Sequence, residues 1–237
     1  MQLCVMASTE SEKEAAASEA AKLISDGITL GLGSGSTVEI LINKFLPNKN
    51  IKLVAASRST QLALQGKGID CLFLDSSAKP DLMIDGADRI DKNLNLIKGG
   101  GGALLSERVL AERSSRYVII ADSSKLTHRL GSDFPIPVEV EPVAYHNLTS
   151  RLESLGLNWR LRSCTCKNGP TVTDNGNWIV DVNASSYRGS LSVLYRNLRM
   201  ITGVVEVGLF LGMADEAFIG TTEGTVRLKR DIKKFSF

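Results

Sequence analysis

Apolar residues follow two alternating spacings along the first half of the chain. Apolar positions three and four residues apart predict helices at residues 12–24, 37–45 and 59–65. Short apolar runs bounded by glycine or polar residues predict strands at residues 27–32, 51–55, 71–74, 82–84 and 117–121. Strands that alternate with helices form parallel sheets, because each helix carries the chain back to the same edge. We therefore expect a Rossmann-like α/β fold, with a parallel sheet and helices on both of its faces.

The pattern changes after Gly131. It then predicts a strand at 135–140, a helix at 145–155, an extended segment at 158–162, a hairpin at 171–182, a helix at 190–200 and a strand at 204–210. The hairpin prediction depends on Asn175-Gly176, a dipeptide strongly favoured in two-residue hairpin turns. This mixture indicates a smaller α+β unit of the ferredoxin-like type. We expect it to be an inserted domain at residues 131–207, within an α/β catalytic domain formed by residues 1–130 and 208–237.

Composition fits a globular protein and argues against a polyanionic partner. The 237 residues are 43% hydrophobic and 23% charged, and the formal net charge is only +2. This balance gives no overall attraction to nucleic acid or to a membrane surface, so we expect neither as a partner. No apolar run is long enough to cross a bilayer, and residues 1–6 are too short for a secretory signal core. A cytoplasmic location is therefore expected.

Metal sites and hydrolase triads find little support in the sequence. The only close cysteine pair, Cys164 and Cys166, is one residue too tight for the usual zinc or thioredoxin spacing. Neither His128 nor His146 stands in a metal-ligand spacing or beside a convincing nucleophile. We expect reduced thiols and no bound metal.

A glycine-rich turn, Gly31-Leu32-Gly33-Ser34-Gly35-Ser36-Thr37, lies between a predicted strand and a predicted helix. Backbone N–H groups, hydroxyls and the positive end of the helix can hold a phosphate there, with Ser34, Gly35, Ser36 and Thr37 as candidate contacts. The turn matches neither the dinucleotide fingerprint nor the P-loop ending. Taken alone, a structural turn is about as expected as an anion site, because Ser36 and Thr37 are also natural helix N-caps.

The densest cluster of reactive groups lies between residues 85 and 107. Asp85-Gly86-Ala87-Asp88 follows a buried strand, and Lys98 precedes four glycines and then Glu107 on a predicted helix. Neighbouring carboxylates push one pKa upward, which suits proton transfer near neutral pH. Consecutive glycines cost folding entropy, which indicates that something approaches this backbone closely. In isolation, Glu107 would be an ordinary first-turn glutamate, and Lys98, Lys13 and Lys125 would be surface lysines.

Four motifs, in order, resemble those of the ribose-5-phosphate isomerase type A family. They are Gly33-Ser34-Gly35-Ser36-Thr37, Asp85-Gly86-Ala87-Asp88, Lys98-Gly99-Gly100-Gly101 with Glu107 nine positions after the lysine, and Ala121-Asp122-Ser123-Ser124-Lys125. The similarity continues through residues 134–140, 172–177 and 207–210 to 219–221, so it covers nearly the entire chain. Two positions depart from the family pattern: Arg89 replaces an acidic residue, and Ser34 replaces a common threonine. Neither departure removes a proposed catalytic group.

The resemblance implies an aldose–ketose isomerase of the pentose phosphate pathway that interconverts ribose 5-phosphate and ribulose 5-phosphate without metal or organic cofactor. Glu107 would be the base, Lys98 would stabilise the enediolate oxygen, and Asp85 with Asp88 would carry hydroxyl protons. The partner would be a small sugar phosphate, and the assembly a homodimer or homotetramer. The substrate would contact Ser34, Gly35, Ser36, Thr37, Gly86, Ala87, Gly99, Gly100, Gly101, Lys125 and Lys13.

Two other functions fit parts of this pattern. A non-catalytic sugar-phosphate-sensing module would need the phosphate loop but could dispense with Glu107 and Asp85. Such a sensor would normally carry a DNA-binding domain, for which 237 residues leave no room. A CoA-transferase-like enzyme with Glu107 as nucleophile would need a much larger nucleotide-binding surface. The proton-transfer residues therefore favour the isomerase.

Overall fold

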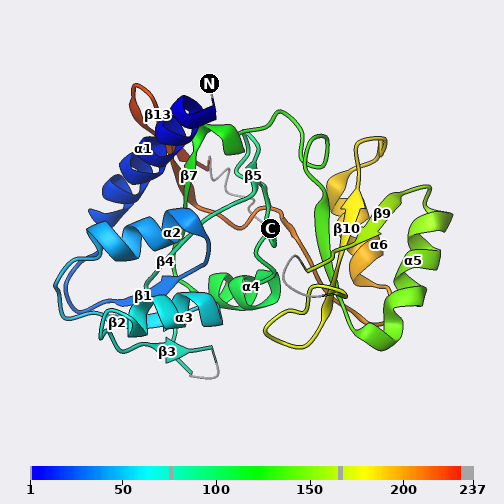
Figure 1. Cartoon of the computed structure of the whole chain (residues 1–237), viewed down its shortest axis with the longest axis horizontal. Coiled ribbons are helices and arrows are strands. Elements are labelled where there is room, and N and C mark those ends of the chain that lie inside the picture. Colours follow the sequence, from blue (N-terminus) through cyan, green and yellow to red (C-terminus); the bar gives the residue numbers. More distant parts are fainter. Residues whose placement is uncertain (1, 75–76, 165–167, 231–237) are drawn as a thin grey trace, which may run out of the picture.

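The main sheet has seven strands in the order β14-β13-β7-β4-β1-β2-β3. The computed structural model describes residues 2–74, 77–164 and 168–230, with side chains from residue 9 onward. All strands of this sheet run parallel except β14, which is antiparallel to β13 (Figure 1). The predicted parallel sheet is therefore confirmed. Its strands are β1 (Thr29–Leu32), β2 (Lys52–Ala55), β3 (Leu72–Phe73), β4 (Leu82–Asp85), β7 (Tyr117–Asp122), β13 (Glu216–Thr221) and β14 (Gly224–Lys229).

Helices cover both faces of this sheet, as the sequence predicts. Two neighbouring residues of β4 point to opposite faces and pack in different cores. Met83 belongs to the core that contains Leu110, and Ile84 belongs to the core that contains Ala17. Since both faces are covered, the strands read as continuous apolar runs. The first helix extends from residue 2 to residue 21, so it begins earlier than predicted. The helices are α1 (Gln2–Ala21), α2 (Ser36–Ile40) continuing as the π-helix η1 (Leu41–Phe45), α3 (Arg58–Gln65) and α4 (Leu104–Arg113).

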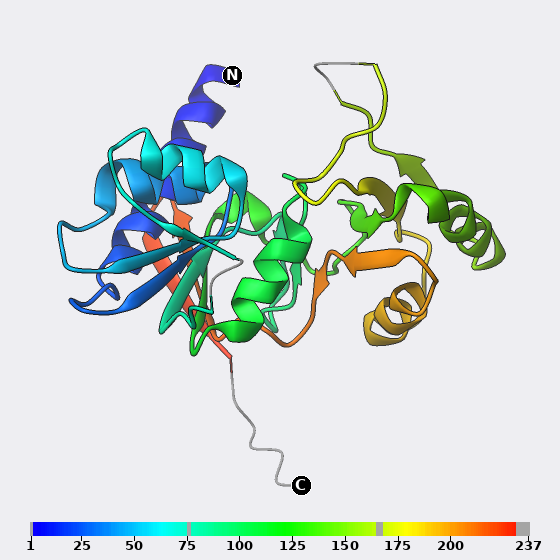
Figure 2. The same ribbon diagram turned by 90° about the horizontal axis from the view of Figure 1, so that it is seen from below.

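A second sheet of four antiparallel strands lies beside the first, in the order β11-β8-β10-β9. Helices α5 and α6 pack on the side of this sheet that faces away from the main sheet (Figure 2). Along the chain the order is strand, helix, strand, strand, helix, strand. The description of residues 131–207 as a separate ferredoxin-like inserted domain stays a prediction. The elements are β8 (Ile136–Val140), α5 (Tyr145–Ser154), β9 (Asn158–Leu161), β10 (Trp178–Asn183), α6 (Leu191–Arg199) and β11 (Val204–Val207).

The predicted hairpin at 171–182 forms only at its turn. The Gly176 N–H donates to Thr173 O at 3.0 Å, and Gly176 has a φ of 85°, which suits glycine. The two arms pair at the bridge between Val172 and Trp178, and next to it the Thr173 N–H donates to Asn177 O at 2.9 Å. Both edges of β10 are already occupied, by β8 and β9, so the first arm finds no free edge along most of the strand.

The predicted strand at 204–210 is divided at Gly208. Its first part is β11, and its second part, β12 (Leu209–Phe210), joins a three-stranded sheet with β5 (Arg89–Ile90) and β6 (Leu96–Ile97), which the sequence did not predict. The Gly208 N–H donates to Pro137 O at 2.7 Å, and Gly208 O accepts from the Lys98 N–H at 2.9 Å. This crossing point ties the second sheet to the backbone of Lys98.

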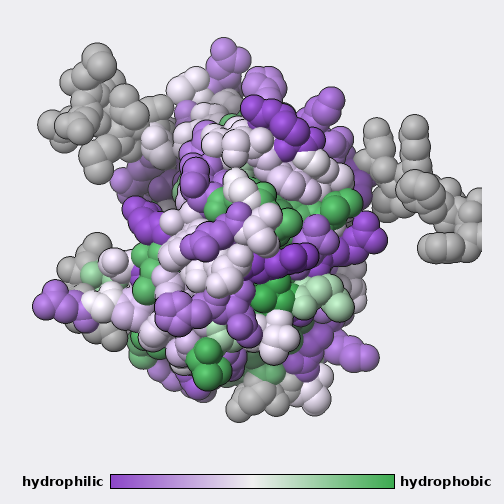
Figure 3. Space-filling view, turned by 90° about the vertical axis from the view of Figure 1, so that its right-hand side faces the viewer, coloured by the Kyte–Doolittle hydropathy of each residue, from purple (hydrophilic) through white to green (hydrophobic). Residues whose placement is uncertain are grey.

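The end of the molecule that carries α5 shows no extended apolar face among the described residues (Figure 3). Figure 3 looks onto the end of the molecule that carries α5 and shows mostly hydrophilic residues with small, scattered hydrophobic groups. Val143 and Met200 are the most exposed of the large hydrophobic residues. Within the described part of the chain, none of the helices is long and apolar enough to cross a membrane.

Candidate active site

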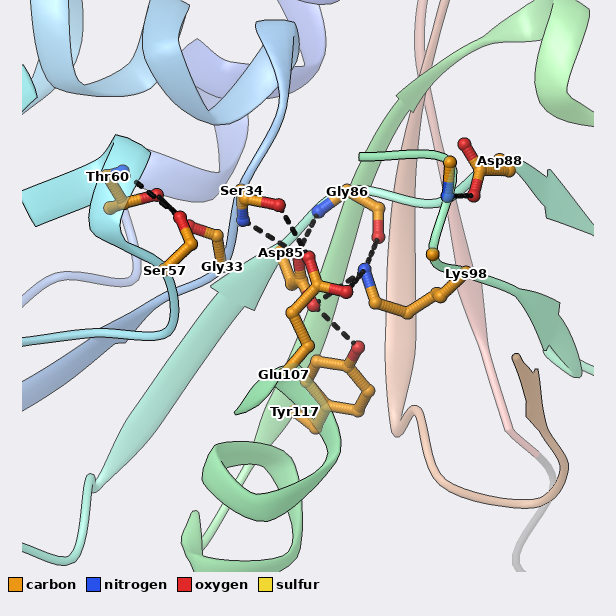
Figure 4. Close-up of polar contacts among 12 residues, drawn as sticks. Gly33, Ser34, Ser57, Thr60, Asp85, Gly86, Asp88, Lys98, Glu107 and Tyr117 are labelled. Carbon is orange, nitrogen blue, oxygen red and sulfur yellow. Dashed lines mark hydrogen bonds and ion pairs between the residues drawn. The ribbon is translucent and has the colours of Figure 1, made fainter. Parts of the chain in front are cut away.

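Lys98 lies at the centre of a buried cluster of charged groups. Its Nζ is 2.8 Å from Asp85 Oδ2 and 3.3 Å from Glu107 Oε2, and it donates to Gly86 O at 2.7 Å. The other oxygen of Glu107 accepts a hydrogen bond from Ser34 Oγ at 2.7 Å. Asp85, Lys98 and Glu107 are each at most 3% exposed. Figure 4 shows that these side chains converge from the end of β4, the loops after β1 and β6, and the first turns of α4.

Asp85 is saturated by protein donors. Its Oδ1 accepts hydrogen bonds from the N–H groups of Gly86 at 2.7 Å and Ser34 at 3.3 Å. Its Oδ2 contacts Lys98 and accepts a hydrogen bond from Tyr117 Oη at 2.9 Å. The sequence did not predict Tyr117, which begins β7 and is 2% exposed. Its only sequence signal is an aromatic residue with a polar tip at the start of a buried strand.

Burial and charge place the proton equilibrium of Glu107 close to neutral pH. Burial, followed by repulsion from Asp85, raises the pKa of Glu107 to about 7, although Lys98 and the Ser34 hydrogen bond act in the opposite direction. Burial alone would lower the pKa of Lys98, but Asp85 and Glu107 outweigh it and raise that pKa. Burial and Asp85 also raise the pKa of Tyr117 well above its ordinary value, so it remains a hydroxyl donor. Glu107 can therefore gain and lose a proton beside a permanent cation.

One pocket brings together most of the residues that the sequence predicted. Two predicted residues are not part of its lining, namely Asp85, which is fully buried behind it, and Lys13. The pocket lies beyond the carboxyl ends of β1, β4 and β7, where ligands of open parallel sheets are usually held. It is lined by Ser34, Gly35, Ser36, Thr37, Gly86, Ala87, Asp88, Lys98, Gly99, Gly100, Gly101, Glu107 and Lys125.

One end of the pocket has the character of an anion site. Ser36 begins α2. Gly35, the residue before it, has a φ of 96°, a backbone conformation that favours glycine. Lys13 on α1 donates to Ser36 Oγ at 3.0 Å, and Lys125 lines the same pocket from the short helix after β7. One ammonium group is therefore hydrogen-bonded to the first residue of α2 and a second lines the same pocket, an arrangement that favours a dianion such as a phosphate.

The four consecutive glycines differ in what favours a glycine at each position. Gly99 and Gly102 have φ values of 101° and 80°, which side chains rarely tolerate. A Cβ on Gly100 would overlap Asp88, whose Oδ2 accepts a hydrogen bond from the Gly100 N–H at 2.7 Å. At Gly101 the nearest atom to an added Cβ is 3.9 Å away, and this residue faces the pocket. Gly102 also has open space at the Cβ position, but its positive φ favours glycine, so Gly101 is the one residue of the run that the protein's own geometry does not require to be glycine.

The sequence also missed the support behind the anion site. Glu12 on α1 is buried, and its Oε2 accepts hydrogen bonds from Ser123 N at 3.0 Å and Ser123 Oγ at 2.7 Å. This pair fixes α1 against the segment that carries Lys125. Arg89, which departs from the family pattern, forms an ion pair with Asp133 at 2.9 Å and is not among the pocket-lining residues.

The described residues offer organic functional groups rather than a metal centre. Among them there is no group of three or more His, Cys, Asp or Glu side chains placed to hold a metal ion. The groups that meet in the pocket are a titratable carboxyl, an ammonium, hydroxyls and backbone amides. They suit proton transfer and the binding of an anion.

The chain matches known proteins along most of its length. The family model described as ribose 5-phosphate isomerase A (phosphoriboisomerase A) matches residues 52–224. The ribose-5-phosphate isomerase of Dictyostelium discoideum is 41% identical over 87% of this chain and 91% of its own length. Ribose-5-phosphate isomerase A of Thermococcus kodakarensis is 38% identical over 93% of this chain and 99% of its own length.

Solved structures agree with these sequence relatives. Ribose 5-phosphate isomerase A from Methanocaldococcus jannaschii has a TM-score of 0.87 and 36% identity, over 93% of this chain and 99% of the other. A D-ribose-5-phosphate isomerase in complex with phospho-erythronic acid has a TM-score of 0.88 and 35% identity, over 94% of this chain and 99% of the other. Sequence and fold agree over nearly the whole chain, which therefore belongs to the ribose 5-phosphate isomerase A family.

Proposed function

We propose that Glu107 is the base of this isomerase and that the pocket around it holds the substrate along its length. The chain interconverts ribose 5-phosphate and ribulose 5-phosphate, as its family membership establishes. The observation that supports the assignment most strongly is the Glu107 carboxyl, which lines the pocket, contacts Lys98 and has a pKa raised to about 7. A group that must both accept and return a proton works best with such a pKa.

The reaction needs one proton to move between adjacent carbons. In the open-chain aldose, the Glu107 carboxylate takes the proton from C2, and the electrons of that C–H bond form the C1–C2 double bond of an enediolate. The carbonyl oxygen on C1 gains the negative charge. Protonated Glu107 then returns the proton to C1, the hydroxyl proton on the C2 oxygen passes to the C1 oxygen, and C2 becomes the carbonyl carbon of ribulose 5-phosphate. One carboxyl group carries out both transfers at carbon, and the hydroxyl proton moves between the two oxygens, so no oxidant or reductant is consumed.

Lys98 is placed to stabilise the enediolate because its positive charge is shared among several oxygen contacts and is not committed to one of them. Among its three oxygen contacts, the one with Glu107 is the longest, at 3.3 Å. When Glu107 becomes protonated, it attracts the ammonium less strongly. At the same moment the substrate becomes an anion, so the ammonium is free to turn toward the new charge. A single such donor typically accounts for about 3 kcal/mol of transition-state stabilisation.

Asp85 and Asp88 receive different roles. Asp85 is fully buried and saturated by protein donors, so we assign it to holding Lys98 and raising the pKa of Glu107. Asp88 lines the pocket, and we assign it the hydroxyl protons and the opening of the sugar ring. This division replaces the direct proton-carrying role that the resemblance implies for Asp85.

We assign the substrate phosphate to the end of the pocket that is formed by the last residues of the loop after β1 and the N-terminus of α2. Ser36 and Thr37 supply hydroxyls and the helix N-terminus, and Lys125 supplies a cation. Lys13 reaches the same place through its hydrogen bond to Ser36. The carbon chain then extends toward Glu107 and Lys98. The family resemblance also supports a homodimer or homotetramer in the cytoplasm, which sedimentation velocity and cell fractionation would test.

The test is the substitution Glu107→Gln, which removes the base with little change in volume. We expect kcat to fall by about 10²- to 10⁴-fold, the usual contribution of a general base, while binding of ribose 5-phosphate stays within about tenfold. Glu112→Gln, the same change at an exposed position of α4, is the matched control and should retain full activity. If Glu107→Gln keeps most of its rate, the base has been assigned to the wrong residue.

Glu107→Gln and Glu112→Gln also separate the isomerase from a non-catalytic sugar-phosphate-sensing module. A sensor binds its ligand without converting it, so Glu107→Gln would leave ligand binding, the only property that can be measured for a sensor, unchanged. A large loss of turnover with binding retained is the behaviour of an enzyme.

A further inference from the structure

Arg162 reaches from the second sheet into the glycine turn of the active site. It directly follows β9, and its Nη1 donates to Gly99 O at 2.7 Å and to Gly100 O at 3.0 Å. Its Nε donates to Asp181 Oδ2 at 3.1 Å, and its Nη2 forms an ion pair with Asp181 Oδ1. The side chain of Arg162 is 16% exposed and that of Asp181 is 5% exposed. One guanidinium therefore joins a buried carboxylate of β10 to two consecutive carbonyl groups of the turn.

These two carbonyl groups determine where the N–H groups of the turn point. A trans peptide is planar, and its C=O and N–H point in opposite directions. Since Arg162 holds Gly100 O, the N–H of Gly101 points away from Arg162, and Gly101 lines the pocket. Among the described residues, no protein group accepts a hydrogen bond from the Gly101 N–H. In the same way, holding Gly99 O sets the Gly100 N–H, which donates to Asp88 Oδ2 at 2.7 Å.

The turn has few other restraints on its orientation. Its internal hydrogen bond runs from the Gly102 N–H to Gly99 O at 3.0 Å. Glycine has the widest conformational freedom of any residue, so a four-glycine turn can rotate its peptide planes at low cost. The rigid fork of an arginine is suited to hold two acceptors on one side and a carboxylate on the other.

We propose that Arg162 is a positioning residue that fixes the Gly99–Gly102 turn, so that the Gly101 N–H faces the enediolate and Asp88 is held at the pocket. This inference rests on the proposed function, because it takes the enediolate as the group that receives the Gly101 N–H. Arg162 acts through the backbone of the turn and through Asp88, not by touching the substrate.

Arg160 provides a matched control. It stands two residues earlier in β9 and forms an ion pair with the same Asp181, at 3.5 Å, but its side chain is 77% exposed. None of the contacts that the structure describes joins Arg160 to the glycine turn. Arg160→Ala and Arg162→Ala therefore both remove an arginine partner of Asp181, and only the second releases the turn.

The experiment measures steady-state kinetics on ribose 5-phosphate, with concentrations corrected for the folded fraction. For Arg162→Ala we expect kcat to fall by about 10- to 100-fold, below the 10²- to 10³-fold typical of deleting an oxyanion donor, with KM within about threefold. Arg162→Lys should show a smaller loss than Arg162→Ala, because its ammonium still pairs with Asp181, but some loss should remain, because one ammonium cannot hold Asp181 and both carbonyl groups together. Arg160→Ala should match the parent. Arg162→Ala within twofold of Arg160→Ala would overturn the proposal.

A second variant covers the case in which the unpaired Asp181 unfolds the chain. Arg162→Met combined with Asp181→Asn removes both charges, so no buried carboxylate is left without a partner. The same loss of kcat is expected in this folded double variant. Parent-like kcat in it would show that the turn needs no clamp.

Two ligands separate positioning from general damage. Phospho-erythronic acid ends in a carboxylate that offers oxygens to the turn, whereas inorganic phosphate offers nothing at that end. In Arg162→Ala the dissociation constant of phospho-erythronic acid should rise about tenfold or more, and that of inorganic phosphate should stay within twofold. An equal rise for both would overturn the inference. If the Arg162 variants behave like the parent while Glu107→Gln is inactive, the positioning role is wrong and the proposed function stands. If Glu107→Gln is active, the proposed function itself is wrong.

Discussion

In the proposed mechanism Glu107 accepts a proton from one carbon and gives it to the next, and its surroundings suit that exchange. A carboxyl in water has a pKa near 4 and is a weak acid catalyst at neutral pH. Burial and Asp85 raise the pKa of Glu107 to about 7, and Lys98 and Ser34 keep it from rising further. The protein therefore balances two opposing effects on one group, and each can be altered by a single substitution.

This balance predicts the pH dependence of the reaction. The base must be ionised in the free enzyme, so kcat/KM for ribose 5-phosphate should rise with pH and level off above about 7. Ser34→Ala removes a donor that favours the carboxylate, so the rising limb should move to higher pH. The substrate phosphate, whose second pKa is about 6, titrates identically in both assays and cannot cause a difference between them. An unmoved limb in Ser34→Ala would show that this limb belongs to another group.

Among the elements, the contact between the ends of β1 and β4 sets the position of Asp85. Gly33 follows β1, and its N–H donates to Ile84 O at 2.9 Å. A Cβ on Gly33 would overlap the carboxylate of Asp85. Asp85 could move away only by giving up its contact with Lys98 or the hydrogen bond that it accepts from the Ser34 N–H in the loop after β1. The close approach of two neighbouring strands is thus a condition for the charged cluster.

We therefore expect Gly33→Ala to damage both stability and activity. Overpacking at a buried position typically costs about 1–3 kcal/mol, which denaturant unfolding would detect. Because Asp85 is displaced, kcat/KM should fall by more than about tenfold. Gly66→Ala is the control, since this glycine ends α3 with a φ of −59° and a Cβ there meets nothing closer than 3.4 Å. A stable and fully active Gly33→Ala would show that Asp85 has more freedom than the contact allows.

The elements also show what could be predicted from the sequence. Long apolar patterns gave the main sheet and its helices, because strands buried on both faces and amphipathic helices leave clear periodicities. The two-residue strands β5 and β6 leave none, so the small sheet beneath Lys98 was missed. The strand at 204–210 was predicted as one because its apolar run is continuous, and only pairing with two different sheets divides it at Gly208.

The residues of the candidate site likewise fall into those that the sequence predicts and those that it does not. Residues in motifs after the strands could be placed near one another, because the carboxyl ends of parallel strands lie on one edge of the sheet. Tyr117 and Arg162 could not, since the groups that they contact, Asp85 and the glycine turn, lie far away in sequence. Their roles depend on how separate elements pack, and neither residue belongs to a recognisable motif.

At the scale of the whole molecule, helix α4, which carries Glu107, is anchored in the second sheet. Arg108, next to Glu107 on α4, has its Nε 2.8 Å from Glu206 Oε1 on β11, and both side chains are buried. It also donates to Val207 O at 3.1 Å and Leu209 O at 2.9 Å. Removing one partner of such a buried pair is usually strongly destabilising. The position of Glu107 is therefore coupled to the packing of the two sheets.

The raised pKa of Glu107 has a cost in stability that depends on pH. Its pKa is about 7 in the folded chain and near 4.5 when unfolded, so between these values the folded protein binds more protons. Stability from this group is thus fully present below pH 4.5 and is lost as pH rises through 7. Glu107→Gln cannot ionise and escapes this loss. Titrating groups that do not interact with Glu107 contribute equally to both proteins and cancel in the difference between them.

The difference in Tm between Glu107→Gln and the parent should therefore become more positive from pH 5 to pH 8. We expect a change of at least about 2 °C, which corresponds to about 1 kcal/mol for a chain of this size. Glu112→Gln removes an exposed carboxyl from the same helix and should show a smaller change. If the two variants behave alike in thermal unfolding across this range, Glu107 is not held against its tendency to ionise. The activity of the pocket would then need a different proton carrier, because the same perturbation underlies both its pH profile and its cost to the fold.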